Sequence, residues 1–207
     1  MTGLEANVLP LMTAWGTGIN PYLTVLLLSG AGMLGVVDLP SGLDWLAEPN
    51  VLAIVAALTA LHFLIDKVPG IDSLWDAANA LGKVPAGAAL AGMAASDAGL
   101  ASQAVFALAG GGLATAAVAT KAGSRALINT SPEPFSNWFA SITEDVAVIL
   151  GISVVFIAPA LAAVLLIVFV VLMLWLLPRL WRGLKLIGRR LSGRTAPVPP
   201  APEPPPG

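Results

Sequence analysis

Two clusters of charged residues lie beside hydrophobic stretches and could bind an ion or relay protons. The first cluster runs from Asp66 to Asp76 and includes Lys67 and Asp72. Asp72 and Asp76 are four residues apart, so on a helix their carboxylates would share one face. Carboxylates at this density near a membrane exceed what helix capping needs, and they could hold a cation or pair with a basic cluster. The simpler alternative is a loop containing an ion pair, in which Asp72 caps a helix.

The second cluster runs from Lys121 to Asp145. Lys121 and Arg125 have the same spacing of four, and together they could hold an anionic group. The simpler interpretation is a pair of charges that only sets membrane topology. Glu144 and Asp145 argue against it, because they fall two to three turns inside a hydrophobic stretch and need a buried partner there. We expect Lys121 or Arg125 to be that partner.

Two further polar residues lie where proline interrupts a hydrophobic stretch. Asn20 precedes a proline in the middle of residues 9–37, and Lys83 lies two residues before Pro85 within residues 71–95. Proline removes a backbone donor, and irregular backbone at membrane depth is tolerated where it lines a cavity or is buried in protein. We therefore expect discontinuous helices at both places, with Lys83 near a central site.

Both clusters and both breaks contribute to a candidate pathway for an ion or solute. Its residues are Asn20, Asp66, Lys67, Asp72, Asp76, Lys83, Lys121, Arg125, Asn129, Glu133, Glu144 and Asp145. Buried opposite charges must find one another or be neutralised, so we expect the two clusters to lie together at one end of a helix bundle.

Few residues suggest catalysis or metal binding. His62, the single histidine, lies one turn before Asp66 and could relay a proton to it, although packing is the commoner role of a lone histidine. There is no cysteine, no metal-ligand spacing, no phosphate-binding glycine loop and no nucleophile motif. The sequence thus predicts no catalytic residue, no metal site and no cofactor.

The composition predicts an integral membrane protein. Of the 207 residues, 57% are hydrophobic and 11% are charged, whereas an average soluble domain carries about 25% charged residues. The excess apolar surface needs lipid to cover it, and crossings of about 20 residues each would consume nearly the whole chain. Little is left for a soluble catalytic domain.

An all-α bundle of about six membrane crossings fits the hydrophobic stretches, with the first and third crossings discontinuous. The crossings are expected over residues 9–37, 50–65, 71–95, 99–120, 135–157 and 160–177. Six of the ten Lys and Arg residues lie between Arg179 and Arg194, and the positive-inside rule places them in the cytoplasm. Six crossings then place both termini there. If residues 71–82 instead lie flat at the interface, the count changes.

The chain divides into three parts. Residues 1–178 form the transmembrane domain, residues 179–194 a basic amphipathic juxtamembrane extension, and residues 195–207 a disordered proline-rich tail. We expect the bacterial inner (cytoplasmic) membrane as the location and the lipid bilayer as a partner. Nucleic acid is not expected, because the basic residues directly follow a hydrophobic span. Faces of small residues could also support a homo-oligomer.

Two stretches are distinctive: Asp-Lys-Val-Pro-Gly at residues 66–70 and Thr-Ser-Pro-Glu-Pro at residues 130–134. With Asn-Pro-Tyr-Leu at residues 20–23, they resemble a bacterial integral-membrane family that is catalogued only as a domain of unknown function. The similarity spans about residues 10 to 180. The resemblance implies a membrane fold and favours the two charged clusters as the functional region, and it implies no activity.

Three functions remain open from the sequence. The leading hypothesis is a small transporter or channel for an ion or solute, in which the charged clusters form the cytoplasmic mouth. A structural or assembly-partner protein would need only packing surfaces, the basic extension and the tail. A membrane enzyme acting on lipid head groups is the third hypothesis, and without a nucleophile and base we expect the chain not to be an enzyme.

Overall fold

The computed structural model describes residues 3–66, 71–128 and 134–192, and these ranges are almost entirely helical. The predicted all-α fold is confirmed. The long helices are α1 (Glu5–Ile19), α2 (Pro21–Met33), α3 (Pro49–Ile65), α4 (Ile71–Ala94), α5 (Leu100–Ile128), α6 (Pro134–Ile157) and α7 (Pro159–Ser192). Two short 3-10 helices, η1 (Ser41–Ala47) and η2 (Ser96–Ala98), lie in the connections.

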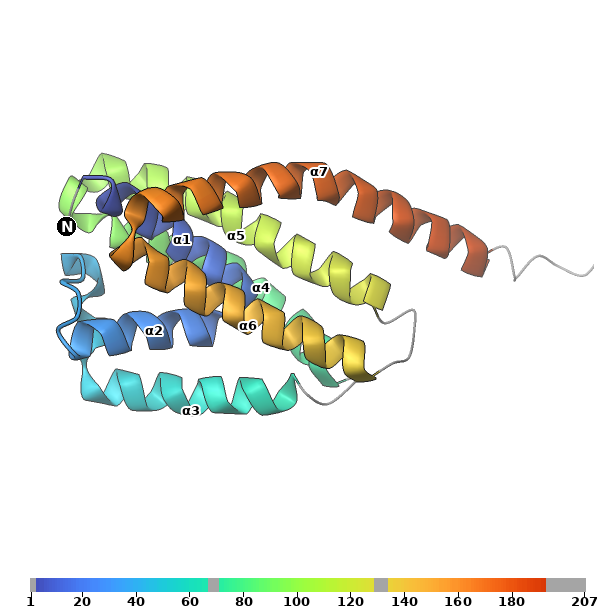
Figure 1. The fold of residues 1–207 in the computed structure, drawn as a ribbon, viewed down its shortest axis with the longest axis horizontal. Coiled ribbons are helices and arrows are strands. Elements are labelled where there is room, and N and C mark those ends of the chain that lie inside the picture. Colours follow the sequence, from blue (N-terminus) through green and yellow to red (C-terminus); the bar gives the residue numbers. More distant parts are fainter. Residues whose placement is uncertain (1–2, 67–70, 129–133, 193–207) are drawn as a thin grey trace, which may run out of the picture.

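Helices α1 and α2 form a hairpin inside the bundle, while α3 to α7 run along its length in alternating directions (Figure 1). Ala6 near the start of α1 and Leu39 after the end of α2 line the same surface pocket, so both ends of the hairpin lie at one end of the molecule. At ~1.5 Å per residue, the 15 residues of α1 reach about 22 Å, less than a ~30 Å hydrocarbon core. The expectation that residues 9–37 make one broken crossing is therefore wrong.

The chain reverses at Asn20 because local signals both end one helix and begin the next. Asn20 has extended dihedral angles (φ −138°, ψ 95°), and its side chain accepts a hydrogen bond from the Leu23 N–H at 3.1 Å. Pro21 follows at the first helical position, where its missing N–H costs nothing. The break predicted here from the sequence is confirmed.

No such break occurs at the second predicted place. Helix α4 is continuous over its 24 residues and contains Pro85 in its interior. A proline removes one hydrogen bond, but position 84 is valine, which offers no capping side chain to start a new helix. The prediction of a discontinuous third crossing is wrong, and residues 71–82 continue into the same helix as Lys83.

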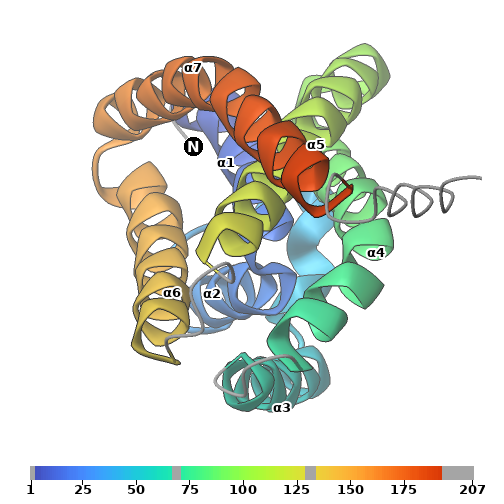
Figure 2. The same cartoon turned by 90° about the vertical axis from the view of Figure 1, so that its right-hand side faces the viewer.

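Small residues allow α1, α4 and α5 to pack closely. A Cβ atom added to Gly18 of α1 would lie 2.7 Å from the Ala114 carbonyl of α5, and one added to Gly87 of α4 would lie 2.7 Å from the Ala114 Cβ. In the end view, α1 lies among the other helices, and α3 lies at the edge beside α2 and α4 (Figure 2). Part of the small-residue face of α5 is thus buried within the chain, and the homo-oligomer stays a prediction.

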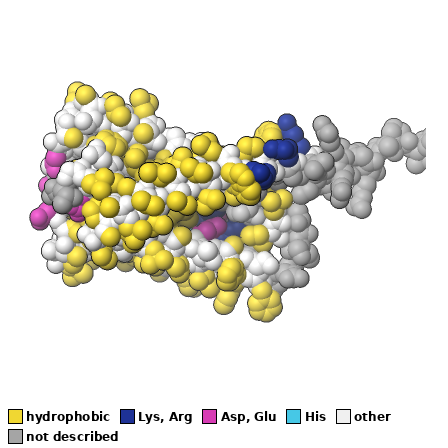
Figure 3. All heavy atoms as spheres, turned by 45° about the horizontal axis from the view of Figure 1, so that its top comes forward, with side chains coloured by type: hydrophobic (Ala, Val, Ile, Leu, Met, Phe, Trp, Pro, Cys, Tyr) yellow, Lys and Arg dark blue, Asp and Glu magenta, His cyan; other side chains and the backbone are white. Residues whose placement is uncertain are grey.

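The acidic connections gather at the end where the hairpin opens. The Ser41 hydroxyl of η1 donates to Asp97 Oδ1 at 2.6 Å, and the Ser41 N–H donates to the same atom at 3.1 Å. These hydrogen bonds to the ionised form lower the pKa of the exposed Asp97 carboxyl. Figure 3 shows acidic side chains at this end and basic side chains toward the other.

Three helical segments in the described ranges are long and apolar enough to cross a membrane: Leu100–Ile128, Phe135–Ile157 and Pro159–Arg179. The pair η1 and α3, which is bent by 74°, would be a fourth. Length and composition therefore indicate a multi-pass membrane protein. Because the hairpin replaces one expected crossing, the start of α1 and the end of α7 lie at opposite ends of the bundle (Figure 1), and not on one side as expected.

Cysteine labelling tests this topology, because the chain contains no cysteine of its own. A single cysteine at Gly3 should react with an impermeant maleimide from the same side of the membrane as one at Ser41. A cysteine at Ser192 should react from the opposite side. Labelling of positions 3 and 192 from one side would restore an even number of crossings and contradict the hairpin.

Candidate functional site

The tip of the hairpin meets two buried lysines. Lys83 of α4 and Lys121 of α5 are 3% and 6% exposed, and their ammonium groups donate to the Ile19 carbonyl of α1 at 3.3 Å and 3.4 Å. The last carbonyls of a helix have no partner within it, and they form the negative end of its dipole. Two ammonium groups on this carbonyl therefore satisfy the end of α1 inside the protein.

The same lysines belong to a chain of ion pairs that joins α4, α5 and α6. Asp76 lies between Lys83 at 2.7 Å and Lys121 at 3.0 Å. Glu144 lies between Lys121 at 3.3 Å and Arg125 at 3.0 Å. Each carboxylate is shared by two cations, and Lys121 takes part in both pairs. The sequence prediction that Lys121 or Arg125 is the buried partner of Glu144 is confirmed.

Asp66, at the end of α3, extends this chain. Its Oδ2 atom accepts a hydrogen bond from the Ser141 hydroxyl of α6 at 3.0 Å, and Arg125 Nη2 lies 3.8 Å away. The Asp66 side chain is 3% exposed, and its Oδ1 atom has no hydrogen-bond partner. The cluster from Asp66 to Asp76 and the cluster from Lys121 to Asp145 therefore meet in one site, as the sequence predicts.

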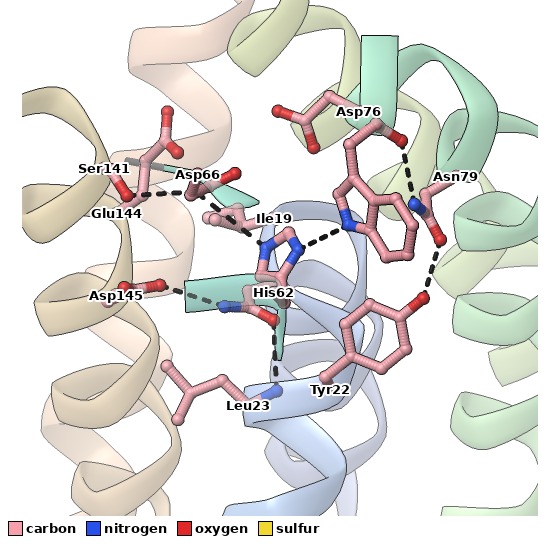
Figure 4. A network of polar contacts seen from close by, with 12 residues as sticks. Ile19, Tyr22, Leu23, His62, Asp66, Asp76, Asn79, Ser141, Glu144 and Asp145 are labelled. Carbon is pink, nitrogen blue, oxygen red and sulfur yellow. Dashed lines mark hydrogen bonds and ion pairs between the residues drawn. The ribbon is translucent and has the colours of Figure 1, made fainter. Parts of the chain in front are cut away.

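His62 connects Asp66 to α4 and α2 (Figure 4). The Trp75 indole N–H donates to His62 Nδ1 at 2.8 Å. Because an indole nitrogen can only donate, Nδ1 carries no proton, and the neutral ring holds its proton on Nε2, which lies 3.9 Å from Asp66 Oδ2. Asn79 donates to the Trp75 carbonyl at 2.8 Å and accepts from the Tyr22 hydroxyl at 2.7 Å. These bonds join the mostly exposed α3 to the hairpin.

Asn20 ties the hairpin to α6. Its amide nitrogen donates to Asp145 Oδ1 at 2.9 Å, while its oxygen caps α2. Asn20 is 3% exposed. One side chain thus both starts a helix and fixes the position of the hairpin tip against a neighbouring helix.

Eight of the twelve predicted pathway residues lie in this network: Asn20, Asp66, Asp76, Lys83, Lys121, Arg125, Glu144 and Asp145. Lys67, Asn129 and Glu133 lie outside the described residues. Asp72 lies in the first turn of α4, and the structure describes its backbone but not its side chain.

The predicted pathway included the uncharged Asn20 but missed other uncharged members of the network: Tyr22, Trp75, Asn79 and Ser141. Ser141 could have been found, because it lies three and four residues before Glu144 and Asp145 and so shares their helix face. Asn79 lies three residues after Asp76, so the same spacing was available there, whereas Trp75 directly precedes Asp76 and has no such spacing to it. The Ile19 carbonyl carried no sequence signal, because only the reversal of the chain brings it to the lysines.

The network brings together three cations, Lys83, Lys121 and Arg125, and four carboxylates, Asp66, Asp76, Glu144 and Asp145. Asp66, Asp76 and Glu144 face nitrogen atoms of the cations, and Asp145 faces the Asn20 amide nitrogen. Within the described ranges no group of three His, Asp or Glu side chains could hold a metal ion. Asp76 and Glu144 are each 18% exposed, so they are the members through which an ion could enter. The arrangement suits exchange of an ion against a tethered ammonium or guanidinium group.

Because Lys83 and Lys121 share Asp76, the effects of replacing each lysine on the free energy of unfolding should not add. Lys83→Met leaves Asp76 paired with Lys121, and Lys121→Met leaves it paired with Lys83, so each replacement should cost about 1–2 kcal/mol of unfolding free energy. The double replacement leaves Asp76 buried without a cation and should cost about 3–5 kcal/mol, more than the sum of the two by roughly 0.5–3 kcal/mol. Thermal unfolding in detergent measures both.

The matched control combines Lys83→Met with Lys185→Met. Lys185 is exposed on α7, so these two effects should add within about 0.5 kcal/mol. Additive costs for Lys83 and Lys121 would show that the two lysines do not share Asp76.

Comparison with known proteins identifies a family but no activity. No curated protein and no solved structure matches the chain. A family model described as a domain of unknown function, DUF4126, matches residues 8–179. This range contains the hairpin, the charged network and the apolar part of α7. It covers most of the chain, so the protein belongs to the DUF4126 family.

Proposed function

We propose that the protein is a small transporter of an ion or small solute in the bacterial cytoplasmic membrane, with its pathway at the tip of the α1–α2 hairpin. The observation that carries this proposal is the convergence of Lys83 and Lys121 on Asp76 and on the Ile19 carbonyl. Half-helices whose ends meet ionisable side chains near the membrane centre are a recurring design of transporter binding sites.

The energetics favour a functional role for these charges. A charged side chain at the centre of a bilayer costs at least ~2.5 kcal/mol on insertion scales. Replacing a buried ion pair by apolar residues of similar volume is often neutral or stabilising. A bundle that only had to fold could carry apolar residues in place of each lysine together with its carboxylate, so the presence of the whole charged set points to a function that needs it.

The pairing pattern also suits movement of an ion. Asp76 and Glu144 each contact two cations, so an entering ion can displace one ammonium or guanidinium group while the other stays in place. No carboxylate is left unpaired during such an exchange, which keeps the barrier low because an isolated buried charge is costly. The tethered lysines then act as internal counter-ions that alternate with the transported ion.

Orientation follows from the exposed basic residues. The positive-inside rule places Arg179 and the residues after it in the cytoplasm. The C-terminal end of α7 is then cytoplasmic, and the acidic end with Asp97 and the start of α1 faces the other side of the membrane. In this orientation the charged network lies toward the cytoplasmic half, because α1 enters from the acidic side and reaches about 22 Å before it ends at the network.

A structural role is the second candidate, because the same contacts also fix the hairpin. It predicts that the network matters for stability alone. An enzyme acting on lipid head groups is the third. The Ser141 hydroxyl donates to Asp66 Oδ2, but the two side chains are 0% and 3% exposed, so a head group cannot reach this hydroxyl. We expect no enzymatic activity.

Flux in reconstituted vesicles separates transport from scaffolding. Gradients of H⁺, Na⁺, K⁺ and Cl⁻ are imposed one at a time, and the wild-type chain should dissipate at least one of them. Lys83→Met should remain folded and monodisperse in detergent, because Asp76 keeps Lys121, while its flux should fall to the level of protein-free vesicles.

Each other outcome decides against the proposed pathway. Flux that is unchanged in Lys83→Met would remove Lys83 from the pathway, and absence of flux in the wild type under every gradient would contradict ion transport. Collapse of the fold in Lys83→Met, followed by rescue in a variant that also carries Asp76→Asn, would favour the structural role.

A further inference from the structure

Helix α7 is longer than a membrane needs. It has 34 residues, about 51 Å at ~1.5 Å per residue, against a ~30 Å hydrocarbon core. Its apolar part ends at Arg179, yet the helix continues to Ser192 and extends past the neighbouring ends of α5 and α6 (Figure 1). The last turns of α7 therefore lie outside the hydrocarbon region.

Two tryptophans mark where α7 leaves that region. Measured from Pro159, Trp175 lies about 24 Å along the helix and Trp181 about 33 Å, so they bracket the ~30 Å boundary. Both side chains are more than half exposed, at 56% and 63%. Tryptophan is enriched at the level of the lipid head groups, which places this segment at that depth.

Three exposed basic side chains lie at the same level. Arg179, Arg182 and Lys185 follow one another at intervals of three, so they fall within about 120° of one helix side. The Arg179 guanidinium lies 3.6 Å from the centre of the Trp175 ring, and Lys185 Nζ lies 5.3 Å from that of Trp181. The cations thus lie against the interfacial tryptophans, at the depth of lipid phosphates.

The other described cations cannot serve this purpose. Lys83, Lys121 and Arg125 are at most 6% exposed and are paired with carboxylates inside the bundle. The basic charge that the described residues present to the lipid surface is therefore that of α7. Juxtamembrane clusters of basic residues bind anionic lipids through charge attraction.

We infer that residues 179–185 of α7 form a binding surface for the phosphates of anionic phospholipids in the leaflet at the end of the bundle. Arg179, Arg182 and Lys185 contact the head groups, and Trp175 and Trp181 hold the segment at head-group depth. This surface is separate from the hairpin site, and its role does not depend on transport.

Lipid selectivity of the full-length chain tests this inference. Bilayers of phosphatidylcholine contain increasing amounts of phosphatidylglycerol with brominated acyl chains, and quenching of tryptophan fluorescence reports contact. Wild type should prefer the anionic lipid, and Arg182→Gln with Lys185→Gln should lower the preference about fivefold for each charge removed. The exchange variant Arg182→Lys with Lys185→Arg conserves the charge and should keep the preference.

Two further measurements, at high salt and with inorganic phosphate, identify the group that the surface binds. Raising the salt concentration to 1 M shortens the Debye length to ~3 Å and should reduce the preference, while inorganic phosphate at the concentration of the anionic lipid should not compete. Equal preference in the wild type and the glutamine variant would overturn the inference. Full competition by inorganic phosphate would show a phosphate site and not a lipid surface.

Discussion

The end of α1 inside the protein is the constraint on which the rest of the structure depends. A helix that stops within a membrane leaves backbone carbonyls without partners, and lipid cannot supply them. Lys83 and Lys121 solve this by donating to the Ile19 carbonyl. Two ammonium groups then require carboxylates, and Asp76 and Glu144 supply them from α4 and α6.

From this requirement follows the order of the bundle. The lysines must reach the hairpin tip from two helices, so α4 and α5 pack directly on α1, and Gly18 and Gly87 permit the close approach to α5. Arg125 also pairs with Asp66 and so connects the ion pairs to the end of α3. His62 accepts a hydrogen bond from Trp75 and so connects α3 to α4. Polar bonds thus hold the end of the peripheral helix α3, whose described side chains are mostly exposed apart from the buried His62.

The sequence indicated where helices break and which charges pair, but it did not indicate how the chain continues in space after a break. The all-helical fold, the break at Asn20, the meeting of the two clusters and the pairing of Glu144 followed from composition, the proline after Asn20 and the cost of buried charge. The direction of the chain after Asn20 did not follow, because a kink and a reversal share the same Asn-Pro signal. The break predicted at Pro85 was wrong because a proline that no capping residue precedes can remain inside a helix.

Hydrogen–deuterium exchange at the hairpin tip tests the central claim most directly, namely that the buried lysines hold the end of α1 in place. The backbone amides of residues 16–20 and 22–24 should exchange slowly in the wild type. In the variant with Lys83→Met and Lys121→Met they should exchange faster, and by a larger factor than amides in the middle of α6. Equal slow exchange at residues 16–24 in both proteins would show that packing alone holds the tip, and would contradict the account.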